Sequence, residues 1–140
     1  MSVFCLTPDV ADASVRRNAV RRLRELRVTL PSFSDLADPT RIGRAQQLTL
    51  SGIGADEPLA PNLWRVHWFN DASRTGRASV PGHIVLPESL TGVKAKIAVA
   101  LGDRFPMIGA HKVLAAYGCL VPRLVTGRFD PQRATPGGAR

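Results

Sequence analysis

The stretch IAVALGDRFPMIGAHKVLAAYGCLV, residues 97–121, decides the fold that we predict for this chain. Its first five residues, 97–101, are all apolar and are typical of a short strand buried on both faces. Glycine, aspartate and proline within residues 102–106 then supply turn chemistry. From about Gly109 a mostly apolar, alanine-rich run predicts a helix that carries Lys112 in its first turn. The stretch therefore predicts a strand, a turn and a lysine-bearing helix, which is an α/β arrangement.

The position of Lys112 allows two roles. Apolar surroundings and a helix N-terminus both disfavour the protonated amine, so Lys112 could form a Schiff base with an aldehyde cofactor. The chain has sixteen arginines but only three lysines, and arginine cannot replace a Schiff-base amine. In the alternative role the aliphatic stem of Lys112 lies along the helix while its amine reaches water. On the residues alone, this second role is the more common one.

Gly109-Ala110-His111-Lys112 resembles the Gly-Ala-His-Lys segment of the tryptophan synthase β-subunit. The wider stretch, residues 102–118, is similar to the strand, loop and lysine helix of the fold-type II pyridoxal-phosphate enzymes. This group includes cysteine synthase, threonine synthase and the serine and threonine dehydratases. A set of cysteine-synthase-like pyridoxal-phosphate proteins resembles the chain from about Asn62 to Pro131 and more loosely before it.

The resemblance implies the α/β core of a fold-type II enzyme, present only in part and preceded by a helical extension. It also implies that Lys112 holds pyridoxal 5'-phosphate as a Schiff base and moves the α-proton of a small amino-acid substrate. The reaction would be a β-elimination or β-replacement, catalysed by a lyase or transferase. His111 would contact the cofactor, or else serve only as an N-terminal helix residue. The complete protein could form a homodimer.

Several groups of the family's site have no candidate residues in this sequence. The Ser/Thr-Gly-Asn loop that binds the substrate carboxylate is expected where residues 134–138 read ATPGG. A glycine-rich phosphate loop and a partner for the pyridine nitrogen should follow, and Gly137-Gly138 is too isolated to replace a phosphate cradle. We therefore expect a truncated or frameshifted chain that is inactive alone, with a disordered tail at residues 132–140.

The amino-acid composition suggests an alternative to an enzyme. The 140 residues are 44% hydrophobic and carry a net charge of +8, which suits one globular domain and raises a basic nucleic-acid-binding module as an alternative. Six arginines lie between residues 16 and 27, but the others are scattered without interleaved aromatics, so we expect no specific nucleic-acid binding. Another alternative is a non-catalytic remnant that packs on a partner subunit.

The sequence offers no sign of a metal site, a disulfide framework or a membrane span. Its two cysteines, Cys5 and Cys119, are too few and too far apart for the first two. No apolar run reaches the length that crosses a bilayer, and the N-terminus lacks a signal-peptide pattern. We therefore expect a cytoplasmic protein without a metal.

Residues 1–61 are expected to form an N-terminal helical extension that ends in a connector. Thr7 and Pro8 suit an N-cap and a first helical residue, for a helix that runs to about Val28. One apolar stripe follows this helix: Val15, Ala19, Leu23 and Leu26. Ser34 or Asp38 can cap a second helical segment at residues 41–48, with Pro39 at a first helical position.

Residues 62–131 are expected to form the start of the catalytic core. Asn62–Asn70 alternates apolar and polar side chains, which predicts a strand with two tryptophans on the buried side and His67 on the other. Further strands are predicted at His83–Leu86 and at residues 121–126.

Overall fold

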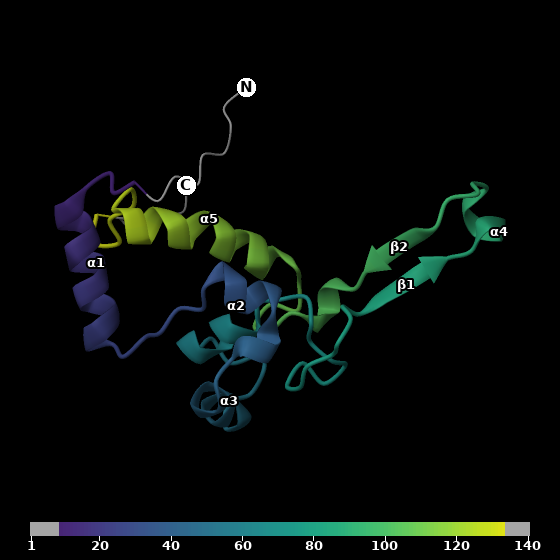
Figure 1. The fold of residues 1–140 in the computed structure, drawn as a ribbon, viewed down its shortest axis with the longest axis horizontal. Helices are drawn as coiled ribbons and strands as arrows, with labels where there is room; N and C mark the ends of the chain where they lie inside the picture. Colours follow the sequence, from purple (N-terminus) through teal and green to yellow (C-terminus); the bar gives the residue numbers. More distant parts are fainter. Residues whose placement is uncertain (1–8, 134–140) are drawn as a thin grey trace, which may run out of the picture. The chain divides into compact units, whose positions relative to one another are not determined.

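The computed structural model describes residues 9–133 and has a mixed α/β fold with a single two-stranded sheet in that part of the chain (Figure 1). The predicted cap at Thr7 and Pro8 lies outside the described residues, as do Cys5 and residues 134–140 of the predicted tail. No helix within residues 9–133 has the length and apolar character needed to cross a membrane.

The chain divides into two compact units. One unit combines the chain up to Thr29 with the chain from Ala115 onward, and the other comprises residues 30–114. The bounds of these two units are set by contacts within each unit. The boundary that we predicted after residue 61 was instead based on the connector in the sequence. That a catalytic core begins at residue 62 stays a prediction.

In the first unit, helix α1 (Ala13–Glu25) begins later than expected because Asp12 is its N-cap. The Asp12 carboxylate accepts hydrogen bonds from the backbone N–H groups of Ser14 at 2.8 Å and Val15 at 3.0 Å. These bonds, with one from the Ser14 hydroxyl, lower the pKa of Asp12. Of the predicted apolar stripe, Ala19 is buried, while Leu26 at the C-cap is exposed.

Helix α5 (Lys112–Thr126) is longer than the sequence indicates. Residues 121–126 were predicted as a strand, and this is wrong, since the helix continues through Pro122 and ends at Thr126. Gly127 follows with φ 75°, the left-handed conformation that commonly terminates a helix. The Thr126 carbonyl then accepts a hydrogen bond from the backbone N–H of Ala11 at 2.8 Å, which ties the start of α1 to the end of α5.

In the second unit, short helical segments precede the sheet. They are α2 (Phe33–Ala37), the 3₁₀ helix η1 (Pro39–Arg41), α3 (Arg44–Ser51) and the 3₁₀ helix η2 (Ala60–Arg65). Ser32 and Asp35 form a capping box at the start of α2. Asp38 caps η1 with Pro39 in its first turn, which confirms the capping pattern predicted there.

The strand predicted at Asn62–Asn70 is absent, and this prediction is wrong. The segment instead completes η2 at Arg65 and then bends. Its two asparagines explain the difference, because their side chains bond to backbone carbonyls. The amide of Asn62 donates to the Gly54 and Glu57 carbonyls at 2.9 and 2.8 Å, and that of Asn70 donates to two carbonyls of its own segment. Local bonds therefore replace those that a neighbouring strand would supply.

Strands β1 (His83–Leu86) and β2 (Ile97–Ala100) form an antiparallel hairpin with α4 (Glu88–Thr91) at its tip (Figure 1). The two strands lie where the sequence predicts them, but the prediction that β2 is buried on both faces is wrong. Most of its side chains are exposed, including Val99 at 40%. Within residues 9–133, β2 pairs with β1 alone, so the two strands form a two-stranded ribbon.

Candidate functional site

The segment that leads to Lys112 is anchored by its own backbone and by two buried side chains. After β2 and the 3₁₀ helix η3 (Gly102–Arg104), Phe105 and Pro106 are fully buried. The backbone N–H of Met107 donates to the Ala55 carbonyl at 2.8 Å. Gly109 then takes φ 56°, a conformation that favours glycine, and α5 begins three residues later. The order of strand, turn and lysine helix agrees with the sequence prediction.

Lys112 is the first residue of α5, and its side chain is exposed. The apolar surroundings that we predicted for it are therefore wrong. The partly buried positions at this end of the helix are Val113 and Leu114, which leaves Lys112 on the solvent side of the first turn. The other two lysines, Lys94 and Lys96, are exposed as well. All three lysines are therefore accessible to solvent. Lys112 differs from the other two only in its position at the start of α5.

His111 is exposed but held by an aromatic contact. Its ring stacks on Trp68 with centroids 6.3 Å apart and planes 17° apart. Trp68 in turn meets the buried Phe105 edge-on, at a centroid distance of 4.7 Å and an angle of 86°. The residue next to Lys112 is thus oriented by a packed aromatic pair. The structure brings His111 and Lys112 together only as neighbours along the chain.

Among the described residues, Lys112 offers an amine to which an aldehyde cofactor could attach. The groups that would bind the phosphate of such a cofactor would have to lie next to it, at the start of α5. The Lys112 amine is accessible to an aldehyde. A phosphate would need free backbone N–H groups nearby. Those of Val113 and Leu114 already donate to the carbonyls of Ala110 at 3.3 Å and His111 at 3.1 Å. The start of α5 therefore offers an attachment point, and two of its backbone N–H groups are not free to bind a phosphate.

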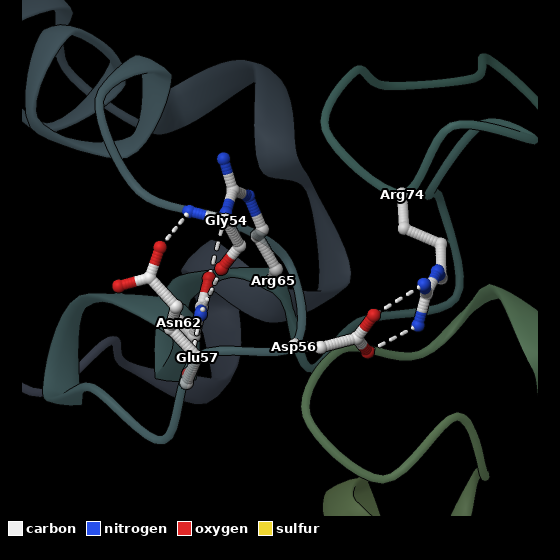
Figure 2. A network of polar contacts seen from close by, with 6 residues as sticks. All are labelled: Gly54, Asp56, Glu57, Asn62, Arg65 and Arg74. Atoms are coloured by element: carbon white, nitrogen blue, oxygen red, sulfur yellow. Dashed lines mark hydrogen bonds and ion pairs between the residues drawn. The ribbon is translucent and has the colours of Figure 1, made fainter.

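Arg65 is the centre of a buried polar network that sequence reasoning missed (Figure 2). One of its terminal nitrogens donates to the Asn62 side-chain oxygen at 2.6 Å and to the Ile53 carbonyl at 3.1 Å, and the other donates to the Leu50 carbonyl at 2.7 Å. Burial lowers the pKa of the guanidinium. The network therefore joins α3, the connector and η2 around one positive charge.

The connector carries two further polar contacts that Figure 2 shows beside this network. The Glu57 carboxylate accepts a hydrogen bond from the backbone N–H of Gly54 at 2.7 Å. Asp56 and Arg74 form a bidentate ion pair, with N–O distances of 2.5 and 2.6 Å, and Arg74 lowers the pKa of Asp56. The connector that the sequence predicted as a boundary is thus an ordered part of its unit.

A cavity of about 300 Å³ lies against this network, within the unit of residues 30–114. Its wall mixes apolar and polar side chains. The lining residues are Pro39, Ile42, Gln47, Leu50, Ser51, Trp64, Arg65, His67, Asn70, Thr75, Gly76 and Arg77. The volume is at the lower end of the range for small-molecule sites.

His67 lies in the wall of this cavity and is 4% exposed, so its predicted place on the outer side of a strand is wrong. Burial, with a smaller contribution from the charge of Arg77, lowers the pKa of His67 to about 4. Its Nδ1 accepts a hydrogen bond from the backbone N–H of Phe69 at 3.1 Å, which places the ring proton on Nε2. The alternation of polar residues with two tryptophans predicted a strand here, and no local pattern in the sequence indicated this cavity.

Comparisons with family models, with curated proteins and with solved structures found no match to this chain.

Proposed function

We propose that the chain carries the cofactor-attachment segment of a pyridoxal-phosphate-dependent lyase or transferase that acts on a small amino acid. The observation that supports this proposal is the position of Lys112. Its exposed amine opens α5 directly after Gly109-Ala110-His111, in the order of strand, turn and helix that the resemblance implies. The finer fold, the start of a fold-type II core behind a helical extension, belongs to the same proposal.

In the proposed reaction, Lys112 and His111 would have different roles. Pyridoxal phosphate, when bound, supplies an electron sink for a carbanion at the substrate α-carbon. Lys112 would hold the cofactor through its Nζ and carry the proton that leaves or returns to that carbon. His111, held against Trp68, would contact the cofactor beside the attachment point. β-Elimination and β-replacement both use this proton transfer.

The 140-residue chain on its own should bind the cofactor weakly and turn over little or no substrate. Orientation and electrostatic stabilisation supply most of the rate in such reactions. The part of the chain that the structure describes provides the amine, but two backbone N–H groups at the start of α5 are not free to bind a phosphate. We therefore expect Lys112 of this chain to react with pyridoxal phosphate, while the chain alone turns over little or no substrate.

The proposal can be tested by titrating the chain with pyridoxal phosphate and following the visible absorbance of the lysine-bound cofactor. Lys112→Arg should remove the saturable component of this signal, because arginine keeps the charge but cannot condense with an aldehyde. The double variant Lys94→Arg/Lys96→Arg is the matched control, because both lysines are equally exposed. A saturable signal that survives in Lys112→Arg and vanishes in the double variant would contradict the proposal.

A second candidate function, a non-catalytic part that packs on a partner subunit, is favoured by the hairpin. Ile84 and Val85 of β1 are 49% and 46% exposed, and Leu90 in α4 is 71% exposed. Apolar side chains gathered on a two-stranded ribbon are typical of surfaces that a partner covers. If this candidate is right, Val85→Lys should reduce self-association or aggregation, measured by light scattering, while the Lys112 label remains unchanged.

A further inference from the structure

We propose that the cavity beside Arg65 binds a small organic anion, with Arg77 and His67 recognising its charged group. This inference does not depend on the proposed cofactor chemistry, because it uses neither Lys112 nor His111. It rests on the charge of the lining, on the hydrogen-bond donors among the lining residues and on the apolar residues of the same lining.

The lining carries two positive charges and no acidic side chain. Arg65 and Arg77 are both lining residues, and the lining contains no aspartate or glutamate. Arg65 is buried, and its guanidinium donates hydrogen bonds to three neutral oxygens. Arg77 donates to the Pro39 carbonyl at 2.6 Å, and neither arginine has a carboxylate within 4 Å among the described residues. Buried charge without a counter-ion is costly, so an anion beside the buried Arg65 would be stabilised. Arg77 is exposed, so its guanidinium is accessible to the charged group of a ligand.

The nearest acidic groups are engaged elsewhere. Asp71 accepts hydrogen bonds from the Ser73 hydroxyl at 2.7 Å and from the backbone N–H of Gly76 at 3.2 Å. Asp38 caps η1 through Thr40, with bonds of 3.1 and 2.5 Å. Both carboxylates therefore make their hydrogen bonds to turns and helix ends. Of the two, Asp38 also interacts with Arg77, whose charge makes a smaller contribution to lowering the pKa of Asp38.

The donors of the cavity are fixed in direction. Because Nδ1 of His67 accepts from Phe69, its Nε2 is a donor. The amide nitrogen of Asn70 donates to the Arg65 and His67 carbonyls at 2.7 and 2.9 Å, which holds this segment in place. A planar guanidinium beside a neutral imidazole N–H suits a carboxylate or a phosphate, which accept several hydrogen bonds at once.

The apolar part of the lining limits the rest of the ligand. Pro39, Ile42, Leu50 and Trp64 contribute apolar surface to a volume of about 300 Å³. This space suits a single ring or a short aliphatic body attached to the charged group. The predicted ligand class is therefore a small oxyanion with an apolar body.

Four probes test separately whether binding needs the charged group and whether it needs the apolar body. Each probe is titrated into the intact chain at low salt, and binding is followed by tryptophan fluorescence. Benzoate and phenyl phosphate combine a ring with a charged group, benzyl alcohol lacks the charge, and inorganic phosphate lacks the ring. We expect saturable binding of benzoate or phenyl phosphate, and the stronger of the two identifies the charged group. Benzyl alcohol and inorganic phosphate should each bind at least tenfold more weakly. Failure of both aromatic anions to bind, or equal binding of benzyl alcohol, would overturn the proposal.

Variants of Arg77 assign the binding to this cavity. Arg77→Gln should weaken the aromatic anion about tenfold, the usual effect of losing one charge-assisted hydrogen bond. Arg77→Lys keeps the charge but not the planar fork and should retain more of the affinity. Arg44→Gln is the matched control, since Arg44 is an exposed arginine of the same unit that does not line the cavity. Equal affinity of Arg77→Gln and Arg44→Gln, with far-ultraviolet circular dichroism unchanged in both, would refute the assignment.

Discussion

Mild acid should destabilise the unit of residues 30–114 through one side chain, His67. In the folded protein its pKa is about 4, while in the unfolded chain it returns to the ordinary value of 6.5. Above pH 6.5 the ring is neutral in both states and the shift has no effect. Between pH 6.5 and pH 4 the unfolded chain binds a proton that the folded protein does not, so the free energy of unfolding falls as the pH falls.

The size of this effect follows from the two pKa values. At pH 5 the unfolded state gains about 2 kcal/mol relative to the folded state, and near pH 4 the loss of stability approaches roughly 3 kcal/mol. Aspartates such as Asp38 and Asp71, whose pKa values are lowered by hydrogen bonds, affect stability at lower pH. The window between pH 6.5 and pH 5 therefore isolates the histidine.

Urea unfolding followed by tryptophan fluorescence measures the effect in the correct unit, because both tryptophans, Trp64 and Trp68, belong to it. His67→Asn keeps an acceptor near the position of Nδ1 but does not titrate, so its stability should change little between pH 7 and pH 5. His83→Asn replaces an exposed histidine and should lose as much as the unaltered chain. If the unaltered chain were equally stable at both pH values, or if His67→Asn lost the same free energy, the assigned environment of His67 would be wrong.

Other substitutions should act on stability in predictable directions. Arg65→Met should cost roughly 3 kcal/mol in urea unfolding, because it leaves the three oxygens that Arg65 binds without their donor, and a cost below about 1 kcal/mol would argue against the buried network. Gly127→Ala should lower the melting temperature, because φ is 75° there and a Cβ would overlap the Asp12 carbonyl oxygen, at a cost of about 1–3 kcal/mol or more. Gly118→Ala is its matched control inside α5, where a Cβ meets nothing within 4 Å, and it should stabilise by about 1 kcal/mol. A stabilising Gly127→Ala would show that α1 and α5 do not meet as described.

The sequence predicted elements well where turn residues bound them. Glycine and proline around His83–Leu86 and Ile97–Ala100 mark both strands, and Gly109 lies in the turn before the lysine helix, three residues ahead of its start. Burial was predicted less well, because an apolar run does not reveal which surface covers it. The run at Ile97–Ala100 pairs with one strand and remains largely exposed, and Lys112 at the helix start is exposed with it.

Alternating and β-branched patterns misled the prediction in two places. The alternation in Asn62–Asn70 suggested a strand, but asparagine side chains at both ends bind backbone carbonyls and favour a 3₁₀ turn and bends. Residues 121–126 suggested a new strand because they form an apolar segment, yet helix α5 continues through Pro122. The cavity beside Arg65 depends on contacts between residues 12 to 38 positions apart, which no local pattern contains.

The most direct measurement for the role of Lys112 is the distribution of a reduced pyridoxyl label among the three lysines. The intact chain would be mixed with less than one equivalent of pyridoxal phosphate, reduced with borohydride, digested and mapped by mass spectrometry. All three lysines are exposed, so unselective chemistry should label Lys94, Lys96 and Lys112 to similar extents. If Lys112 is the attachment residue, the positive end of α5 and the neighbouring His111 should direct most of the label to it. An even distribution, or a label concentrated on Lys94 or Lys96, would contradict the proposed function.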